Sequence, residues 1–359
     1  MFRHPEIEEH ELVEHVSDPS CGLRAIIALH STALGPAFGG CRMRPYASEA
    51  DALNDALRLS RGMTCKAAIM GLPYGGGKTV VIGDPARDKT RPLLLALGRA
   101  VERLNGRYII ADDIGTNLDD LVVMREVTLH TAGATLAARA PLAVTAHGVF
   151  MAIRAAVLHL FGRNDLAGLA VAVQGLGHVG MPLCGLLHEA GAALVVADID
   201  PTRTAEAARR FAARVVAPEA IYAQPVDVLA PCALGAVLDD RTIPCLEARL
   251  VAGGANNQLA LPRHDAMLAG RGILYVPDYI ANAGGVIDFD QERRDDRPEA
   301  VLAAVARIYD VTLDVLARAA AAGATPLTVA DWLVAERLRA GRSSPAGAPP
   351  PAIAAGRGA

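Results

Sequence analysis

Two lysines and an aspartate in the first third of the chain carry groups that could move protons. Lys78 ends the glycine run "GLPYGGGK", Lys66 lies in "GMTCKAA" and Asp113 lies in "ADDIGT". Both lysines have apolar, glycine-rich neighbours, where an isolated ammonium is costly. Burial or a second nearby cation would lower a lysine pKa towards the range of a general base. Either lysine could instead be a surface residue whose stem packs on apolar neighbours.

The run before Lys78 is not a phosphate-binding loop. The pattern G-x-x-x-x-G-K-[ST] needs a glycine at residue 72, where the chain has Leu72, and Gly71 is one residue out of place. The following "TVVIGDP" predicts a strand, whereas a phosphate loop leads into a helix whose N-terminus faces the anion. Lys78 therefore has a role other than phosphate binding.

A glycine turn between two predicted strands indicates a dinucleotide site. "LAVAVQ" predicts a buried strand, "GLGHVG" the turn, and "LVVAD" a second strand that ends at Asp198. This is G-x-G-x-x-G in its βαβ setting, with an acid after the next strand. Gly175 permits the tight turn, Gly177 lets a pyrophosphate approach the backbone, and Gly180 lets helix and strand pack. Asp198 would accept hydrogen bonds from the ribose of the adenosine.

Three further apolar strands each lead into a loop of small and amide residues. They are "DVLAP" before "CALGA", "RLVAGG" before "ANNQL", and "ILYVP" before "DYIANAGG". Ligands of open parallel sheets bind beyond the carboxyl ends of the strands, so these loops could form the floor of a cofactor site. Any one of them alone could be an ordinary turn.

Composition excludes several classes of protein. The 359 residues have room for about two domains, and the formal charge of −4 gives no basic surplus for nucleic acid. Six cysteines without a C-x-x-C pair predict free thiols and a cytoplasmic location. The charged N-terminus is unlike a signal peptide, and no uncharged apolar stretch approaches a membrane span. Residues 343–359, rich in Pro, Ala and Gly, are predicted to be a disordered tail.

The histidines offer a weaker basis for chemistry. "HELVEH", residues 10–15, has one residue too many for a helical zinc pair and is expected to be an exposed acidic helix, so we predict no metal. His178 lies in the glycine turn and His147 at the start of a predicted helix. Either could be a structural histidine.

The first third alternates predicted strands and helices. "LRAIIALHS" (Leu23–Ser31) is a β-branched apolar run of strand length. Ser48 and Asp51 have capping-box spacing before a helix that continues through "DALRLSRGMT". A second helix is predicted over Arg91–Leu104, and "RYIIA" predicts a strand before Asp113.

At this point the motifs carry a resemblance to a known family. They are "LGPAFGGCRM", "DALRLSRGMT", "GGGKTVVIGDP", "LNGRYIIADDIGT", "VAVQGLGHVG", "APCALGAVL" and "NAGGVI". Their order and content resemble the leucine/valine/phenylalanine dehydrogenases of the glutamate dehydrogenase superfamily, almost collinearly from Leu23 to Arg339. The resemblance implies NAD-dependent, reversible oxidative deamination of an L-amino acid to a 2-oxo acid and ammonium.

The resemblance also implies roles for individual residues. Lys66 would hold the substrate carboxylate with backbone around Gly39 and Gly40. Lys78 would activate the water that attacks the imine carbon, and Asp113 would carry protons to and from the substrate nitrogen. The implied cofactor-binding residues are Gly175, Gly177, His178, Val179, Gly180, Asp198, Thr145 and Asn257. The implied lining of the side-chain pocket is Phe38, Ala111, Val286 and Phe289.

Two segments depart from the family pattern. "ATLAARAPLA" before "VTAHG" lacks the family's longer loop rich in glycine and serine. "DFDQERRDDRPEA" after "GGVI" replaces the usual sequence there. Both segments are expected to flank the substrate, so they bear on which amino acid is used.

The sequence therefore predicts an α/β protein of two domains with the active site in the cleft between them. Residues 1–138 with a returning helix at 326–342 form the predicted substrate domain, and residues 139–325 form a Rossmann domain. The leading function is oxidative deamination of a branched-chain L-amino acid, by a homo-oligomer. The alternatives are a family member acting on aromatic amino acids and an inactive NAD-binding regulatory protein.

Overall fold

The protein forms two compact units. In the computed structural model, Met1–Pro141 and Val334–Ala359 make unit 1, and Leu142–Leu333 makes unit 2. The structure describes residues 4–7, 9–132, 143–292, 294 and 297–343. The segment "ATLAARAPL", part of "DFDQERRDDRPEA" and the tail from residue 344 lie outside the described residues.

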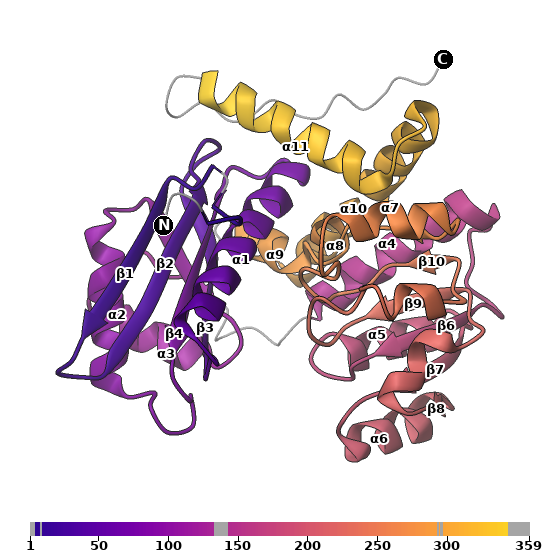
Figure 1. Ribbon diagram of the computed structural model, residues 1–359, viewed down its shortest axis with the longest axis horizontal. Helices are drawn as coiled ribbons and strands as arrows, with labels where there is room; N and C mark the ends of the chain where they lie inside the picture. Colours follow the sequence, from indigo (N-terminus) through magenta and orange to yellow (C-terminus); the bar gives the residue numbers. More distant parts are fainter. Residues whose placement is uncertain (1–3, 8, 133–142, 293, 295–296, 344–359) are drawn as a thin grey trace. The chain divides into compact units, whose positions relative to one another are not determined.

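Unit 1 is a mixed sheet with helices on both faces (Figure 1). Its elements are β1 (Leu12–Asp18), β2 (Leu23–Ser31), β3 (Ala37–Arg44), α1 (Glu49–Ile69), β4 (Gly75–Ile82), α2 (Arg91–Arg103), β5 (Tyr108–Asp112) and α3 (Leu118–Met124). The strand order is β1-β2-β4-β3-β5. β3 is parallel to both of its neighbours, whereas β2 is antiparallel to β1 and β4.

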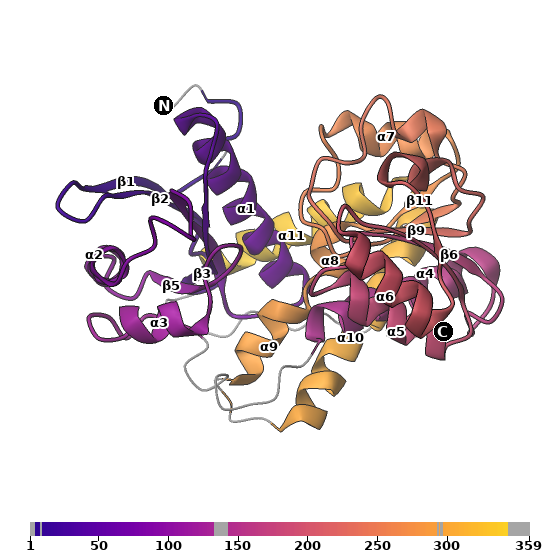
Figure 2. The same ribbon diagram turned by 90° about the horizontal axis from the view of Figure 1, so that it is seen from below.

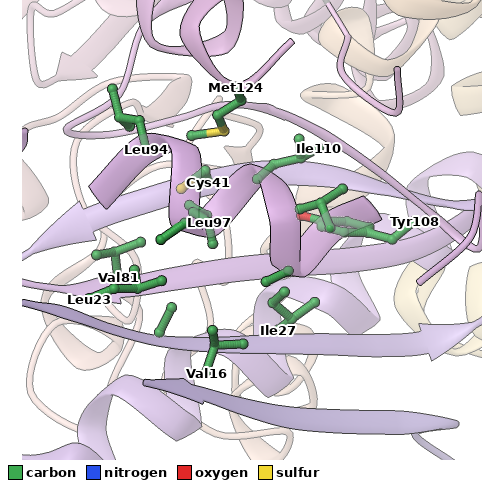
Figure 3. Packing of buried hydrophobic residues seen from close by; sticks show 14 of the residues in the cluster. Val16, Leu23, Ile27, Cys41, Val81, Leu94, Leu97, Tyr108, Ile110 and Met124 are labelled. Carbon is green, nitrogen blue, oxygen red and sulfur yellow. The ribbon is translucent and has the colours of Figure 1, made fainter. Parts of the chain in front are cut away.

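The two faces of this sheet bury separate apolar clusters. On one face α1 packs through Ala52, Ala56 and Leu57 against β2 and β4. On the other face α2 and α3 cover the sheet, and Figure 3 shows Leu97 and Met124 in this cluster. The predicted strand Leu23–Ser31, the helix after Ser48 and the helix over Arg91–Leu104 are confirmed, including the Ser48 cap that accepts a hydrogen bond from the Asp51 amide. The sheet is thus held rigidly from both sides.

Two local predictions in unit 1 were wrong. Residues 12–15 of "HELVEH" belong to strand β1, not to a helix, because they pair with β2 along the edge of the sheet. Strand β4 begins at Gly75 and not at Thr79 as predicted, so the glycines before Lys78 lie inside the strand. Both segments take their conformation from pairing with β2, which is distant in sequence from the glycine run.

Unit 2 is a doubly wound parallel sheet. Its first elements are α4 (Val144–Phe161), β6 (Ala170–Gln174), α5 (Gly180–Glu189), β7 (Ala193–Ala197), α6 (Pro201–Phe211), β8 (Arg214–Val215), a 3₁₀ turn (Pro218–Ala223) and β9 (Val228–Pro231). Then come a 3₁₀ turn (Ile243–Cys245), β10 (Leu250–Val251), α7 (Arg263–Gly270), β11 (Leu274–Tyr275), α8 (Asp278–Ala281), α9 (Gly284–Glu292) and α10 (Pro298–Ala322). The strand order β8-β7-β6-β9-β10-β11 is the Rossmann order, so this part of the predicted fold is confirmed.

Helices α4, α9 and α10 pack on one another beside this sheet, and Figure 2 shows α9 next to α10. By length and composition α4 could cross a membrane, but half of its apolar window is buried inside the protein. Such burial is typical of a core helix. Its Gly148 lies where a Cβ would come within 2.7 Å of the Ile308 side chain on α10 and 3.0 Å of the Ala281 carbonyl oxygen, so a larger residue there would displace its neighbours.

Helix α11 (Pro326–Ser343) passes from unit 2 into unit 1. Asp331 accepts a hydrogen bond from the Tyr279 hydroxyl of unit 2 at 2.8 Å, whereas Arg337 donates to the Ala68 carbonyl of unit 1. The chain therefore changes unit between Leu333 and Val334, inside the helix and later than the predicted boundary at 325/326. Ser343 ends this helix and is not part of the tail.

Candidate active site

Lys78 is fixed by a strand that packs unusually closely against its neighbours. Lys78 lies on β4 between β2 and β3, and its side chain is only 6% exposed. The three glycines before it leave no room for a side chain. A Cβ on them would lie, in chain order, 1.8 Å from the Ser31 carbonyl oxygen, 2.1 Å from the Thr64 amide nitrogen and 2.6 Å from the Tyr108 ring. These glycines therefore let the backbone of β2 and α1 and the ring of Tyr108 approach β4 closely.

The Lys78 ammonium donates a hydrogen bond to Asp113, which follows strand β5. The same carboxylate oxygen, Oδ2, accepts a second hydrogen bond from the Nε of Arg42 at 3.0 Å. Thr116 closes the turn after β5, since its Oγ1 accepts from the Asp113 amide at 3.0 Å and donates to the Cys41 carbonyl at 2.6 Å. One carboxylate thus faces two cations and is anchored through its own backbone.

Burial and charge shift both pKa values of the pair downwards. Burial lowers the pKa of Lys78 below its ordinary value, the Asp113 carboxylate opposes this, and the charge of Arg42 adds to it. For Asp113 burial alone would raise the pKa, but the charges of Lys78 and Arg42 outweigh it and hold that pKa well below its usual range. Asp113 is therefore ionised, and Lys78 loses its proton more readily than an exposed lysine. A lysine of this kind is suited to general base chemistry.

The predicted substrate-binding glycines lie beside this pair. A Cβ on Gly40 would fall 2.8 Å from the Asp113 Cβ and 3.1 Å from the Lys78 Nζ. A Cβ on Gly39 would lie 1.8 Å from the Gly77 carbonyl oxygen, and the Gly39 carbonyl accepts from the Tyr108 hydroxyl at 2.8 Å. The backbone of β3 therefore runs directly past the two side chains, and substitution of either glycine would displace it.

The remaining predicted residues of unit 1 surround the same strands. Lys66 is buried in the last turn of α1, and Ala111 on β5 is paired with Gly40. Phe38 on β3 is buried, with its ring 6.1 Å from that of Tyr74. Among the residues that the structure describes, no three His, Cys, Asp or Glu side chains gather to hold a metal.

In unit 2 the glycine turn fits a dinucleotide. Gly175 has a positive φ of 88° and follows β6, and a Cβ on Gly180 would lie 1.8 Å from the Gly175 carbonyl oxygen. Around Gly177, by contrast, the nearest atom to such a Cβ is the Arg203 guanidinium at 3.7 Å. The space over Gly177 is thus open where a pyrophosphate would approach, close to the N-terminus of α5.

Asp198 is fixed at the end of β7, next to this turn. Its Oδ2 accepts from the Leu176 amide at 2.6 Å, and its Oδ1 accepts from the Asp200 amide at 2.8 Å. Each carboxylate oxygen has a second lone pair that can accept a ribose hydroxyl. The residues present therefore fit the adenosine end of a nicotinamide dinucleotide.

The other predicted residues of unit 2 lie at strand ends and on two helices. Val179 packs against Gly254, where a Cβ would lie 2.6 Å from its side chain. Thr145 is in the first turn of α4, near Gly285, and the Asn257 amide donates to the Asp278 carboxylate. His178 lies in the turn before α5, while Val286 and Phe289 are buried on α9, three residues apart and so on one face.

Comparison with known proteins gives this arrangement a family. A model described as the dimerisation domain of Glu/Leu/Phe/Val dehydrogenases matches residues 10–130, and one described as Glutamate/Leucine/Phenylalanine/Valine dehydrogenase matches residues 199–293. Leucine dehydrogenase of Thermoactinomyces intermedius is 46% identical over 341 residues, 94% of this chain and 93% of that protein. The chain belongs to the glutamate/leucine/phenylalanine/valine dehydrogenase family. It is an amino acid dehydrogenase, as the motifs predicted.

Other relatives in the family differ in the substrate that their names carry. L-tryptophan dehydrogenase of Nostoc punctiforme is 45% identical over 92% of this chain and 93% of that protein. A crystal structure of that enzyme matches with a TM-score of 0.78 at 43% identity, covering 93% of this chain and 97% of the other. Glutamate dehydrogenase of Thermus thermophilus, at 24% identity, has the same fold with a TM-score of 0.78.

The contacts of Arg42 were missed at the sequence level. The residue was visible only as part of the motif "GGCRM", and no role was inferred for it. The signal was a permanently charged side chain between Cys41 and Met43, in a strand that is otherwise apolar as far as Arg44 at its end. Such a residue needs a buried partner, and that partner is Asp113.

Proposed function

We propose that the protein catalyses reversible, NAD-dependent oxidative deamination of a branched-chain L-amino acid to its 2-oxo acid and ammonium. The observation that carries the proposal is the buried contact between Lys78 and Asp113, in which the pKa of the lysine is lowered. The open turn at Gly177 and the fixed carboxylate of Asp198 support a dinucleotide partner. A bound nicotinamide dinucleotide would supply the acceptor for the hydride of the substrate.

The residues of unit 1 would handle the protons of this reaction. Lys66 would bind the substrate carboxylate, and Asp113 would take a proton from the amino group so that the nitrogen can form an imine. After the Cα hydrogen has left as hydride, neutral Lys78 would accept a proton from the water that attacks the imine carbon. Asp113 would return its proton to the nitrogen of the resulting carbinolamine. As the carbonyl of the 2-oxo acid forms, the departing ammonia would take up the hydroxyl proton and leave as ammonium.

A panel of L-amino acids with NAD, followed at the NADH absorbance, tests the proposal. Turnover of leucine, valine or isoleucine well above that of other amino acids is the expected result. A lead of phenylalanine or tryptophan would favour the aromatic alternative, which the tryptophan dehydrogenase relative supports. Binding of NADH without turnover of any amino acid would favour a regulatory protein and overturn the proposal.

The side-chain pocket is expected to prefer valine or another short branched substrate over phenylalanine. Phe38 and Phe289 are both buried, and they would fill space that a large side chain needs. Apolar pockets discriminate by about 1–3 kcal/mol per methylene. Phe289→Val should therefore move kcat/KM towards longer side chains, whereas Phe211→Val, the same change on α6, should not. If phenylalanine leads in the unmodified enzyme, the pocket argument is wrong.

The enzyme is expected to prefer NAD over NADP. A 2′-phosphate would remove a hydrogen bond to Asp198 and meet its charge, and bonds to charged groups contribute about 1.5–3 kcal/mol, or about 10- to 150-fold in kcat/KM. Arg203 lies near Gly177 and forms an ion pair with Asp200 at 3.3 Å, so it could offset this repulsion. Kinetics with both dinucleotides, repeated for Arg203→Ala, separate the two charges. Equal efficiency with NADP in the unmodified enzyme would contradict the prediction.

A further inference from the structure

Arg42 occupies the strand between the two that carry the proton-handling side chains. Lys78 is on β4, Asp113 follows β5, and β3 lies between these strands with Arg42 near its end. The Arg42 side chain is only 11% exposed. A guanidinium remains charged when buried, so it must be held by acceptors on every side.

Two carboxylates hold the guanidinium at opposite ends. Its Nε donates to Asp113 Oδ2 at 3.0 Å, and its Nη1 donates to Asp55 Oδ2 on α1 at 3.1 Å. Asp55 is fixed in turn, because its Oδ2 also accepts from the Tyr46 hydroxyl at 2.7 Å. The Arg44 guanidinium stacks over the Tyr46 ring at 4.4 Å. The chain from Tyr46 through Asp55 to Arg42 thus ends at the carboxylate that contacts Lys78.

We propose that Arg42 is a positioning residue, held by Asp55, that fixes the Asp113 carboxylate against Lys78 and keeps a permanent positive charge beside the pair. This inference rests on the proposed function, in which Lys78 is the base and Asp113 the proton carrier. Asp113 then keeps its place when Lys78 changes protonation state, because Arg42 continues to bond the same oxygen. A lysine at this position would lack the planar fork that reaches two carboxylates.

The other charged or ionisable groups around the pair do not replace Arg42. Those that act on Lys78 or Asp113 are Cys41 on β3 and Asp112 and Tyr108 on β5, while Asp55 bonds the other end of the guanidinium. Burial raises the pKa of the Cys41 thiol to about 12, and burial raises that of Tyr108 further, so both are neutral. Arg42 is the cation that acts on both Lys78 and Asp113, so its loss would remove a positive charge from beside the pair and the bond that holds Asp55 to Asp113 through the guanidinium.

The first test is Arg42→Gln, measured by kcat/KM over pH in the direction of deamination. The rate of this step rises with pH as Lys78 loses its proton. Without the repulsion of Arg42 the acidic limb should move up by about one pH unit. With Asp113 free to shift by about 1 Å, kcat should fall by about 100-fold. The Kd for NADH should not change.

Two further variants separate charge from geometry. Arg42→Lys keeps the charge without the fork, so the acidic limb should stay in place while kcat falls about 10-fold. Asp55→Asn removes the second anchor but leaves the Arg42 charge, so kcat should fall and the limb should not move up. Arg91→Gln is the matched control, because it removes the same charge from an exposed ion pair with Glu126 on the same unit. It should leave both the limb and kcat unchanged.

A readout without substrate keeps the inference separate from the proposed function. Trace acetylation with acetic anhydride, followed by peptide mass spectrometry, reports the neutral fraction of Lys78 at each pH. In Arg42→Gln the midpoint, the pH at which half of Lys78 is neutral, should rise, even if the variant oxidises no amino acid. An unmoved midpoint, or a loss of kcat in Arg42→Gln that follows only its loss of thermal stability, overturns the inference. If Arg42→Gln does not fold, the Arg42→Lys variant decides: an acidic limb of its pH profile that moves up also overturns the inference.

Discussion

Lys78→Ala is expected to lower kcat by about 10⁴-fold, the upper end of what loss of a general base costs, while NADH binding survives. The lysine would act on the water that attacks the substrate carbon, and the glycine turn that fits the dinucleotide lies in unit 2. The fold should tolerate the change, because Asp113 keeps its bond to Arg42 and no carboxylate is left unpaired. Stopped-flow turnover, NADH fluorescence titration and the melting temperature measure the three quantities.

Lys78→Arg is the informative companion to this variant. It keeps a positive charge against Asp113 but cannot lose a proton near neutral pH, so it should be as inactive as the alanine variant. Substantial turnover by Lys78→Arg would mean that Lys78 acts only through its charge. Loss of NADH affinity in step with loss of rate in Lys78→Ala would instead restore the phosphate-binding interpretation of the glycine run.

Much of the fold could be predicted because its signals are local. The apolar run Leu23–Ser31 is strand β2 residue for residue, and the helix predicted over Arg91–Leu104 is α2 to within one residue. The glycine turn was recognisable because the steric requirement for each glycine arises within the βαβ unit itself. The error at residues 12–15 arose because their pairing with the next strand across a hairpin outweighs their helix-like composition, whereas the glycine run is shaped by β2, which is remote from it in sequence.

The site was less accessible to prediction from residues alone. Lys78 and Asp113 are 35 positions apart, and Arg42 and Asp113 are 71 apart, so spacing cannot show that they touch. Local composition indicated only that the residues around Lys78 are apolar. The family resemblance supplied the roles of Lys78 and Asp113. It supplied none for Arg42, Asp55 or Tyr46, because their importance follows from a contact chain that appears only when β3, α1 and β5 are assembled.

Asp113→Asn is expected to lower kcat by about 10²–10⁴-fold and, unlike Arg42→Gln, to move the acidic limb of the pH profile down. An amide cannot carry the proton of the substrate nitrogen, which accounts for the lost rate. Its neutral oxygen no longer stabilises the Lys78 ammonium, and the charge of Arg42 remains, so Lys78 should lose its proton at lower pH. The two variants thus shift one limb in opposite directions, which general damage to the site would not do.

The neighbouring carboxylate provides the control for this prediction. Asp112 carries the same group one residue earlier, on an exposed residue whose charge also acts on Lys78 and Asp113. Asp112→Asn is therefore the control for the rate and not for the limb, and it should keep most of the rate. The measurement is kcat against pH for both variants, with the amino acid that leads the panel. If Asp113→Asn also keeps most of its rate, Asp113 does not carry the proton, and its contact with Lys78 serves only to link β4 with the end of β5 across β3.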